Sequence, residues 1–215
     1  NLTADGKYAY VWDAENRLKE ISPMGTPVLG DKKLTFTYDY MGRRVEKVYW
    51  IYKAAGACGN ESADWCEQSR RRFVYDNWNV ILVLDGSNNV KTKYAWGLDL
   101  SGLAGNASVS GIHGAGGIGG LLAAVETGGM HADTYWFTYD GNGNVGQVLN
   151  ATNPTSIIIA AHYEYDPYGN TLRSAGSYAA ANPFRFSSKW LDSKLAGWNI
   201  QGAVGTGLTG RSGAR

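Results

Sequence analysis

The sequence predicts an all-β protein made of stacked β-hairpins that form part of a curved or spiral shell. The first observation is composition. The 215 residues include 29 Gly, 14 Tyr and 8 Trp, which combines turn formers with aromatics that favour strands. The second is a short motif, aromatic-any-aromatic-Asp, that recurs five times. The third is that no long stretch has the 3.6-residue periodicity of a helix. Together these observations predict many short strands joined by tight turns.

The five copies of the motif begin at Tyr10, Phe36, Phe73, Phe137 and Tyr163, and each has Gly or Asn three residues after its Asp. Aromatics at positions i and i+2 lie on the same side of a strand, so each copy places two rings on one face. The Asp carboxylate can accept backbone N–H bonds from the turn, and Gly or Asn tolerates the positive φ that reverses the chain. The predicted turn residues are Asp13 and Asn16, Asp39 and Gly42, Asp76 and Asn79, Asp140 and Gly143, and Asp166 and Gly169.

A second alternating stretch follows each turn, so each unit is predicted to be a β-hairpin. The spacing between the aspartates is irregular although the turn signature is constant, which places the insertions in loops. We expect inserts at about 54–68 and 97–133 in a hairpin array that covers residues 1–180. Hairpins with one aromatic face must bury it against neighbouring hairpins, which favours a continuous curved sheet.

Charge and hydropathy exclude several functional classes. The formal net charge of +1 supplies no global attraction for nucleic acid or an anionic membrane. No run approaches the roughly 20 apolar residues of a spanning helix. The first 13 residues have no signal-peptide pattern, and the chain is expected to be an excerpt of a longer one. Cys58 and Cys66 lie in a polar insert, where they are either a small-loop disulfide of an exported protein or two incidental thiols.

The repeats resemble the YD repeat of bacterial Rhs proteins, which is also found in insecticidal toxin-complex C subunits and animal teneurins. The strings Tyr38-Asp-Tyr-Met-Gly-Arg-Arg-Val and Tyr163-Glu-Tyr-Asp-Pro-Tyr-Gly-Asn carry the resemblance, which covers Tyr10 to about Asp192. Residues 181–192 are similar to the start of the Rhs-associated core segment, and the rest of that segment is missing. Residues 193–215 are instead Gly-rich, and we expect a flexible tail, for which a frameshift is one explanation. The residues that match the start of the core segment are Asn182, Pro183, Phe184, Arg185 and Phe186.

The resemblance implies a structural shell of a polymorphic toxin or secreted repeat protein, located outside the bacterium or on its surface. The implied partner is the protein's own C-terminal effector. For this chain itself we expect no enzyme activity, cofactor or metal. Family cleavage is attributed to aspartates of the later core segment, so Asp166-Pro167 is interpreted as a turn. The alternative is a carbohydrate-binding or adhesive surface, in which Trp50, Trp65, Trp78 and Trp96 would be stacking platforms.

Other motifs carry less chemistry. The string from Gly114 to Gly119 matches dinucleotide-binding spacing, but it lacks a preceding strand and a following Gly-Lys-Ser/Thr, so we interpret it as a hairpin connection. Ser187 and Ser188 have no nucleophile elbow around them. The histidines, His113, His131 and His162, are too far apart for a zinc site. Arg70-Arg71-Arg72 is the only compact basic cluster and is expected to be a solvated edge that precedes a strand.

Overall fold

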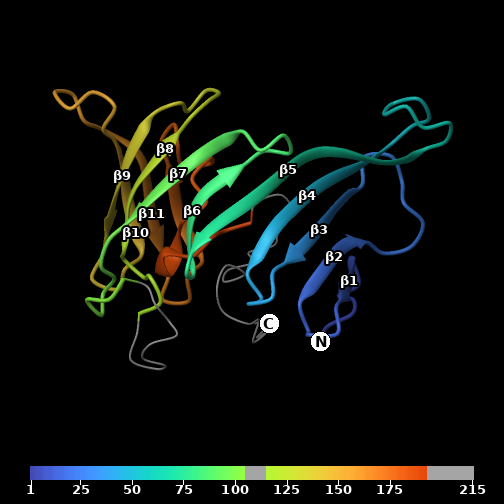
Figure 1. Ribbon diagram of the computed structural model, residues 1–215, viewed down its shortest axis with the longest axis horizontal. Coiled ribbons are helices and arrows are strands. Elements are labelled where there is room, and N and C mark those ends of the chain that lie inside the picture. The colour runs from blue at the N-terminus through green and yellow to red at the C-terminus, as the bar shows by residue number, and fades with distance from the viewer. Residues whose placement is uncertain (105–114, 193–215) are drawn as a thin grey trace. The chain divides into compact units, whose positions relative to one another are not determined.

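The computed structural model describes residues 1–104 and 115–192, and this part of the chain contains strands and one 3₁₀ turn but no α-helix. Twelve strands form one open antiparallel sheet in which sheet order equals chain order (Figure 1). The all-β prediction is therefore confirmed. Within the described residues, no helix is long and apolar enough to cross a membrane.

The strands are short, as the turn spacing predicts, except for β4 and β5. The elements are β1 (Tyr8–Trp12), β2 (Leu18–Pro23), β3 (Lys32–Tyr38), β4 (Arg44–Lys53), β5 (Asp64–Asp76), β6 (Asn79–Leu84), β7 (Val90–Trp96), β8 (Leu121–Glu126), β9 (Thr134–Tyr139), β10 (Val145–Asn150), β11 (Ile158–Tyr165), β12 (Thr171–Ala175) and the 3₁₀ turn η2 (Phe186–Ser188).

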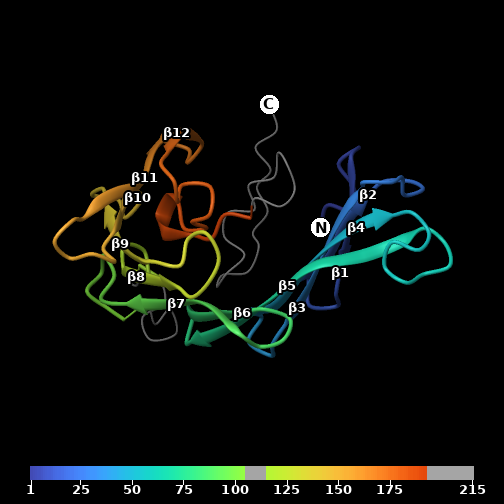
Figure 2. The same ribbon diagram turned by 90° about the horizontal axis from the view of Figure 1, so that it is seen from above.

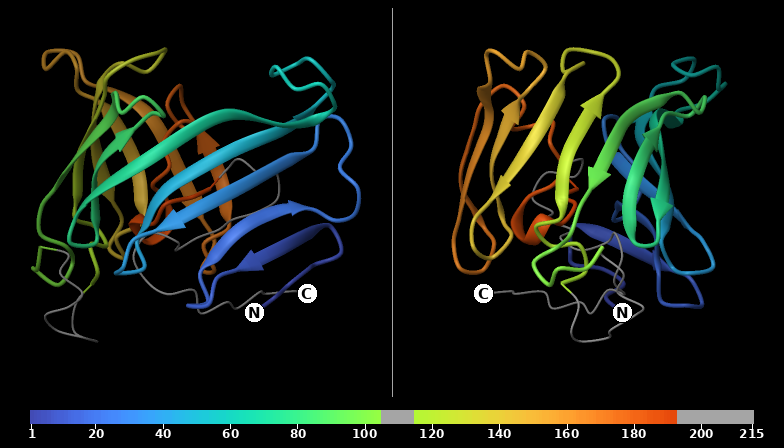
Figure 3. Two further views of the ribbon diagram at one scale, coloured as in Figure 1. Left: turned by 45° about the vertical axis from the view of Figure 1, so that its right-hand side comes forward. Right: turned by 60° about the vertical axis from the view of Figure 1, so that its left-hand side comes forward.

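The chain divides into two compact units. Among the described residues, unit 1 holds 1–73 and 85–88, and unit 2 holds 74–84 and the rest from residue 89. Strand β5 therefore lies mostly in unit 1 and ends in unit 2. In each unit successive strands run in opposite directions, so the turns lie at the two ends of the strands (Figure 3).

Unit 1 buries one face of strands β1 to β5. Its core includes a row in which Tyr10 on β1 pairs with Ile21 on β2, and Ile21 pairs with Leu34 on β3. These three side chains are at most 5% exposed. Side chains alternate between the faces of a strand, so the neighbours of these residues point to the opposite face. The first aromatics of the first two motif copies, Tyr10 and Phe36, are thus core, whereas the second aromatics, Trp12 and Tyr38, are only half-buried.

Unit 2 also buries one face of its strands, and a later part of the chain covers that face. A row of buried side chains runs from Tyr94 on β7 through Ala124 on β8 to Tyr135 on β9. After β12 the chain leaves the sheet, and we call residues 176–192 the return segment. Figure 2 shows β7 to β12 curving around this segment. Its side chains of Tyr178, Phe184 and Trp190 are at most 4% exposed.

The expected insert at 97–133 and the expected position of the arginine cluster need correction. The insert expected at 97–133 contains strand β8, which pairs with both β7 and β9. The arginines at 70–72 do not precede a strand, because they lie inside β5. Arg70 and Arg72 form ion pairs with Glu46 of β4 at 2.7 and 3.0 Å, so they link two strands of unit 1. The tail expected at 193–215 and residue His113 lie outside the described residues.

Candidate functional site: the aspartate turns and the covered sheet face

Four of the five predicted aspartates close their turns with the carboxylate. In the second turn, Oδ1 of Asp39 accepts hydrogen bonds from the backbone N–H groups of Met41 (3.0 Å) and Arg43 (2.9 Å). Oδ2 accepts from Nε of Arg43 at 2.7 Å. Burial raises the pKa of Asp39, but the bonds and charge of Arg43 outweigh it and hold the pKa below its ordinary value. The same pattern of hydrogen bonds recurs at Asp13, Asp140 and Asp166, where Oδ1 accepts from two backbone N–H groups at 2.8 to 3.0 Å.

The third residue after each of these aspartates has a left-handed backbone. The φ angle is 60° at Asn16, 79° at Gly42, 74° at Gly143 and 87° at Gly169. Its N–H donates to the carbonyl of the turn aspartate, for example from Gly42 to Asp39 at 3.0 Å. A left-handed residue costs least when it is Gly or Asn, which explains the residue types at this position.

The third predicted turn has a different geometry. Strand β5 continues through Asp76 and β6 begins at Asn79, so only Asn77 and Trp78 connect them. The left-handed residue is Asn77, with a φ of 50°, and not Asn79. The prediction for Asp76 and Asn79 was therefore wrong in its geometry, because a two-residue hairpin loop reverses the chain without a carboxylate cap.

Two further aspartate turns were missed by the sequence analysis. Asp99 accepts from the N–H groups of Ser101 (2.9 Å) and Leu103 (3.2 Å), and Gly102 has a φ of 73°. Asp85 accepts from the N–H of Ser87 at 2.9 Å. Both aspartates have Gly or Asn three residues later, but neither has the two aromatics directly before it. The turn half of the motif was the signal that could have found them.

In three of the five motif copies, the hydroxyl of the second aromatic bonds the backbone where an earlier strand begins. The Tyr38 hydroxyl donates to the carbonyl of Leu18 (2.9 Å), where β2 begins. The Tyr165 hydroxyl donates in the same way to Val145 (3.0 Å), where β10 begins. Burial raises the pKa of the Tyr165 hydroxyl, so it stays a proton donor. These hydrogen bonds hold adjacent turns side by side at the same end of the strands. Tyr139 and Trp96 make equivalent bonds to Leu121 and Val80.

The described glycines of the dinucleotide-like string bond groups of the chain itself. Oδ2 of Asp99 accepts from the N–H of Gly117 at 3.0 Å. Gly119 donates its N–H to Oγ of Ser188 (2.9 Å), and Nζ of Lys189 donates to the carbonyl of Gly116 (3.2 Å). This loop therefore joins the Asp99 turn to the return segment. The N–H groups of Gly117 and Gly119 are already used in these hydrogen bonds. The cavity beside it, lined in part by Trp78 and Trp96, has about 20 Å³, room for one water molecule.

The return segment is anchored at its beginning by a tyrosine. The rings of Tyr178 and Tyr135 stack with their centroids 3.7 Å apart, and the Tyr178 hydroxyl donates to Glu126 at 2.7 Å. Near its end, Ser187 donates its N–H to the Asn144 side chain and Ser188 its hydroxyl to the Gly143 carbonyl, both at 2.8 Å. The segment thus binds both the sheet face and the Asp140 turn.

All five residues predicted for the start of the core segment gather in this segment. Nε of Arg185 donates to the Asn182 carbonyl at 3.1 Å, while its guanidinium carbon lies 4.0 Å above the centre of the Tyr163 ring. Phe184 packs edge-on against Tyr94, with centroids 5.1 Å apart. Phe186 packs against Tyr165, and the carbonyl of Pro183 accepts from the N–H of Leu191. The Asn182 amide is 1% exposed and bonds the backbone N–H and carbonyl of Phe184.

The described histidines contact neighbouring side chains, and two of the tryptophans proposed as stacking platforms lie beside a lysine. His131 packs on Tyr178, and His162 pairs with Glu164 at 3.0 Å. Nζ of Lys33 lies 5.5 Å from the ring centre of Trp50 and 4.7 Å from that of Trp65. No group of three or more His, Cys, Asp or Glu that could hold a metal occurs between residues 1 and 104 or 115 and 192.

The single open sheet, with a face covered by the chain's own return segment, is an Rhs-type fold. The solved structure of TcdB2–TccC3 with Cdc42 superposes with a TM-score of 0.54 at 16% identity and covers 88% of this chain. TcdB2–TccC3 alone gives 0.53 at 15% identity over 87%. In both, the match takes up 8% of the larger chain.

Sequence comparison finds bacterial toxin-related relatives. The tRNA3(Ser)-specific nuclease WapA of Bacillus spizizenii is 26% identical over 196 residues, and the tRNA(Glu)-specific nuclease WapA of Bacillus subtilis subsp. natto is 28% identical over 194 residues. Each alignment covers 89% of this chain but 6% of the relative. The chain therefore spans only a small part of the length of these relatives. No family model matches the chain.

Proposed function

We propose that this chain is a wall segment of a β-shell in an exported or surface-located bacterial protein, and that the shell encloses or presents a C-terminal effector. The observation that carries the proposal is the covered face of unit 2. There the return segment places Phe184 and Arg185 against the rings of Tyr94 and Tyr163 and closes the face of the sheet. A wall that must separate its contents from solvent needs such a sealed aromatic face.

The turn chemistry supports a scaffold over a catalyst. Asp166 spends both carboxylate oxygens on its own turn, because Oδ1 accepts two backbone N–H groups and Oδ2 accepts the Asn170 amide at 2.6 Å. These bonds hold the pKa of Asp166 below its ordinary value. A carboxylate held in this way is a poor general acid and a committed structural cap. In this proposal, residues 181–192 are the start of the Rhs-associated core segment.

The test uses the intact protein, expressed from its full reading frame with a tag on the C-terminal region. We expect that region to resist a protease until the shell is unfolded by urea, and to become sensitive in the variant Phe184→Ala/Trp190→Ala. The matched control is Leu172→Ala, because Leu172 is 70% exposed on β12. A C-terminal region that is digested equally fast in the native protein and in urea would contradict the proposal.

The structure disfavours the carbohydrate-binding alternative. Sugars stack on open ring faces, but Lys33 lies over both Trp50 and Trp65. Trp96 donates its ring N–H to Val80 and packs against Phe184. We therefore expect no specific signal from the intact protein on a glycan array. A specific signal that Trp65→Ala removes would restore the alternative.

A further inference from the structure

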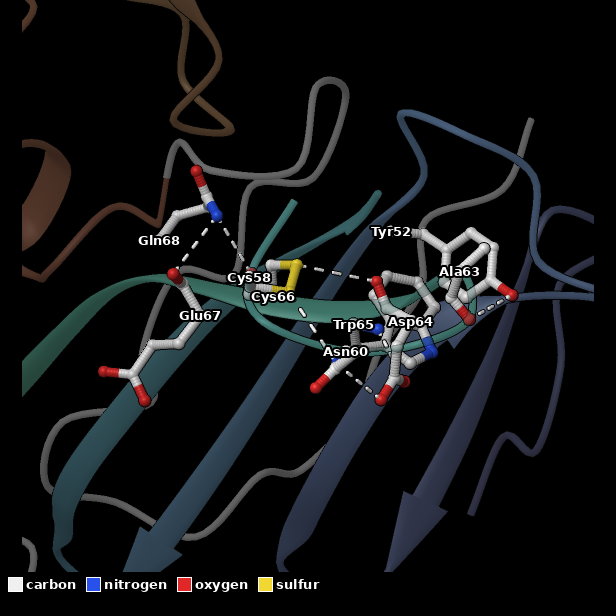
Figure 4. The surroundings of a disulfide bond; sticks show 9 residues. All are labelled: Tyr52, Cys58, Asn60, Ala63, Asp64, Trp65, Cys66, Glu67 and Gln68. Atoms are coloured by element: carbon white, nitrogen blue, oxygen red, sulfur yellow. Dashed lines mark hydrogen bonds between the residues drawn. A yellow bond between two sulfur atoms is a disulfide. The ribbon is translucent and has the colours of Figure 1, made fainter. Parts of the chain in front are cut away.

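The long β4–β5 hairpin of unit 1 ends in a tip that a disulfide closes. Cys58 and Cys66 are bonded, with their Cα atoms 5.9 Å apart. Figure 4 shows the bond at this tip, with Tyr52 and Trp65 beside it. Both cysteines of the chain are used, so no other thiol competes for the pairing. The pairing settles the alternative that the sequence left open in favour of a disulfide.

The tip has little besides this bond to hold it. Strand β3 supports β4 only as far as Tyr52, whose N–H donates to Asp31 at 2.9 Å. The last strand pair is Lys53 with Asp64, and every residue between them except Asn60 is exposed. Its internal contacts include local hydrogen bonds, such as the one that the Asn60 amide donates to the Asp64 carboxylate at 3.0 Å. Segments with few buried apolar contacts open at low cost in free energy.

The two sulfurs differ in exposure. Cys66 is 2% exposed and lies in β5 opposite Ile51, while Cys58 is exposed on the loop. A dithiol reductant would therefore attack Sγ of Cys58. The attack forms a mixed disulfide and releases Cys66 as a thiolate. The second thiol of the reductant then closes its own disulfide and frees Cys58, so the protein gains two thiols and the reductant is oxidised.

The geometry points to a redox-controlled clasp: the Cys58–Cys66 bond orders the hairpin tip in an oxidising compartment, and its reduction opens residues 54–63 while the sheet of unit 1 stays folded. Thiols stay reduced in the bacterial cytosol and disulfides persist after export. The tip is then open and protease-sensitive before export and closed afterwards. The inference goes beyond the proposed function, and its test requires neither a shell nor an effector.

The experiment is limited proteolysis of the 215-residue chain with a glutamyl endopeptidase, before and after treatment with dithiothreitol. Mass spectrometry follows cleavage after Glu61 inside the tip and, as an internal reference, after Glu15 in the exposed first turn. We expect reduction to raise the rate at Glu61 at least tenfold and to leave the rate at Glu15 and the far-ultraviolet circular dichroism unchanged. The variant Cys58→Ala, which keeps the buried Cys66, should show the fast rate with and without reductant.

Two results would overturn the clasp. Equal cleavage rates at Glu61 in the oxidised and reduced chain would mean that the bond does not order the tip. A loss of the circular dichroism signal on reduction, with cleavage rising equally at Glu15, would mean that the bond staples the whole sheet and not the tip alone.

Discussion

The ring of Tyr178 lies parallel to the ring of Tyr135, with 3.7 Å between centroids and 4° between planes. Tyr178 is completely buried, and its hydroxyl reaches Glu126 on the neighbouring strand. This pair marks the point where the chain, after leaving the sheet at β12, returns to it. The return segment should therefore depend on this tyrosine more than on any exposed residue of β12.

Replacement of Tyr178 by Ala is expected to lower the free energy of unfolding of unit 2 by about 3 to 5 kcal/mol, because it removes a buried aromatic ring. Tyr178→Phe keeps the ring and loses the hydroxyl bond to Glu126, so its cost should be roughly 1 to 2 kcal/mol. Urea denaturation followed by tryptophan fluorescence measures both. If the two variants are equally stable, the stacking with Tyr135 does not anchor the segment.

A comparison of two aspartates tests the turn cap. Asp39→Ala removes the acceptor for two backbone N–H groups and for Arg43, with an expected loss of roughly 0.5 to 2 kcal/mol. Asp76→Ala should cost less, because its two-residue loop forms without such a cap. Equilibrium unfolding of both variants decides the matter. Equal losses would show that the aspartate acts through something other than the capped turn.

The capped aspartates also predict acid sensitivity. Their folded pKa values lie below the ordinary value of about 3.9, since the bonds from Arg43 at Asp39 and from Asn144 at Asp140 outweigh the effect of burial. A lowered folded pKa stabilises the fold above the unfolded pKa, and this contribution is lost as the pH falls through the folded pKa. Stability should therefore drop below about pH 4. The drop should be shallower in Asp39→Asn/Asp140→Asn, and denaturation curves between pH 2 and 7 that match the wild type would refute the assignment.

The turns could be located from the sequence because their information is local. The carboxylate of Asp140, its acceptor pattern and the left-handed Gly143 lie within five consecutive residues. The all-β class follows from the same periodicity. In contrast, Gly119 reaches Ser188 across 69 residues of chain, so no local string reveals that the glycine loop joins the return segment. The same reason explains why β8, inside a Gly-rich stretch, was read as a loop.

The residues of the core-segment start could be named from the resemblance, but their contacts could not. Nothing in the string around Arg185 predicts that its guanidinium covers the Tyr163 ring. The sequence could not decide whether the two cysteines form a disulfide for a similar reason, since two positions in a sequence do not give the distance between their Cα atoms. The contact of Lys33 with Trp50 and Trp65 could not be predicted either, because Lys33 lies on another strand.

Arg44 occupies the position that Leu18 fills in the first repeat and Val145 in the fourth. It directly follows Arg43 of the second turn, as Leu18 follows Arg17 in the first. Its side chain is fully buried, with the guanidinium carbon 5.2 Å from the Phe36 ring centre and 5.5 Å from that of Phe73.

Because burying a charge offsets much of what its contacts contribute, Arg44→Leu should leave the stability of unit 1 unchanged or raise it by about 1 to 2 kcal/mol. Arg44→Ala leaves a cavity and should destabilise it by about 2 kcal/mol or more. Thermal unfolding of both variants separates charge from volume. A loss in Arg44→Leu as large as in Arg44→Ala would mean that the guanidinium itself is required.

The last prediction concerns the glycine loop, which is interpreted here as a structural joint. Gly117 has a φ of 83°, and a Cβ added there would lie 2.8 Å from Oδ1 of Asn79. Gly117→Ala should therefore destabilise unit 2 by about 1 to 3 kcal/mol through backbone strain and the displaced amide. It should also loosen the return segment, because the neighbouring Gly119 and Gly116 bond Ser188 and Lys189 of that segment. The matched control is Gly128→Ala, where an added Cβ meets no atom within 4 Å and φ is not positive. Hydrogen exchange across residues 176–192 reads out the coupling: exchange that rises in Gly117→Ala and not in Gly128→Ala supports the joint, whereas a loss of stability without faster exchange would confine the glycine's role to its own loop.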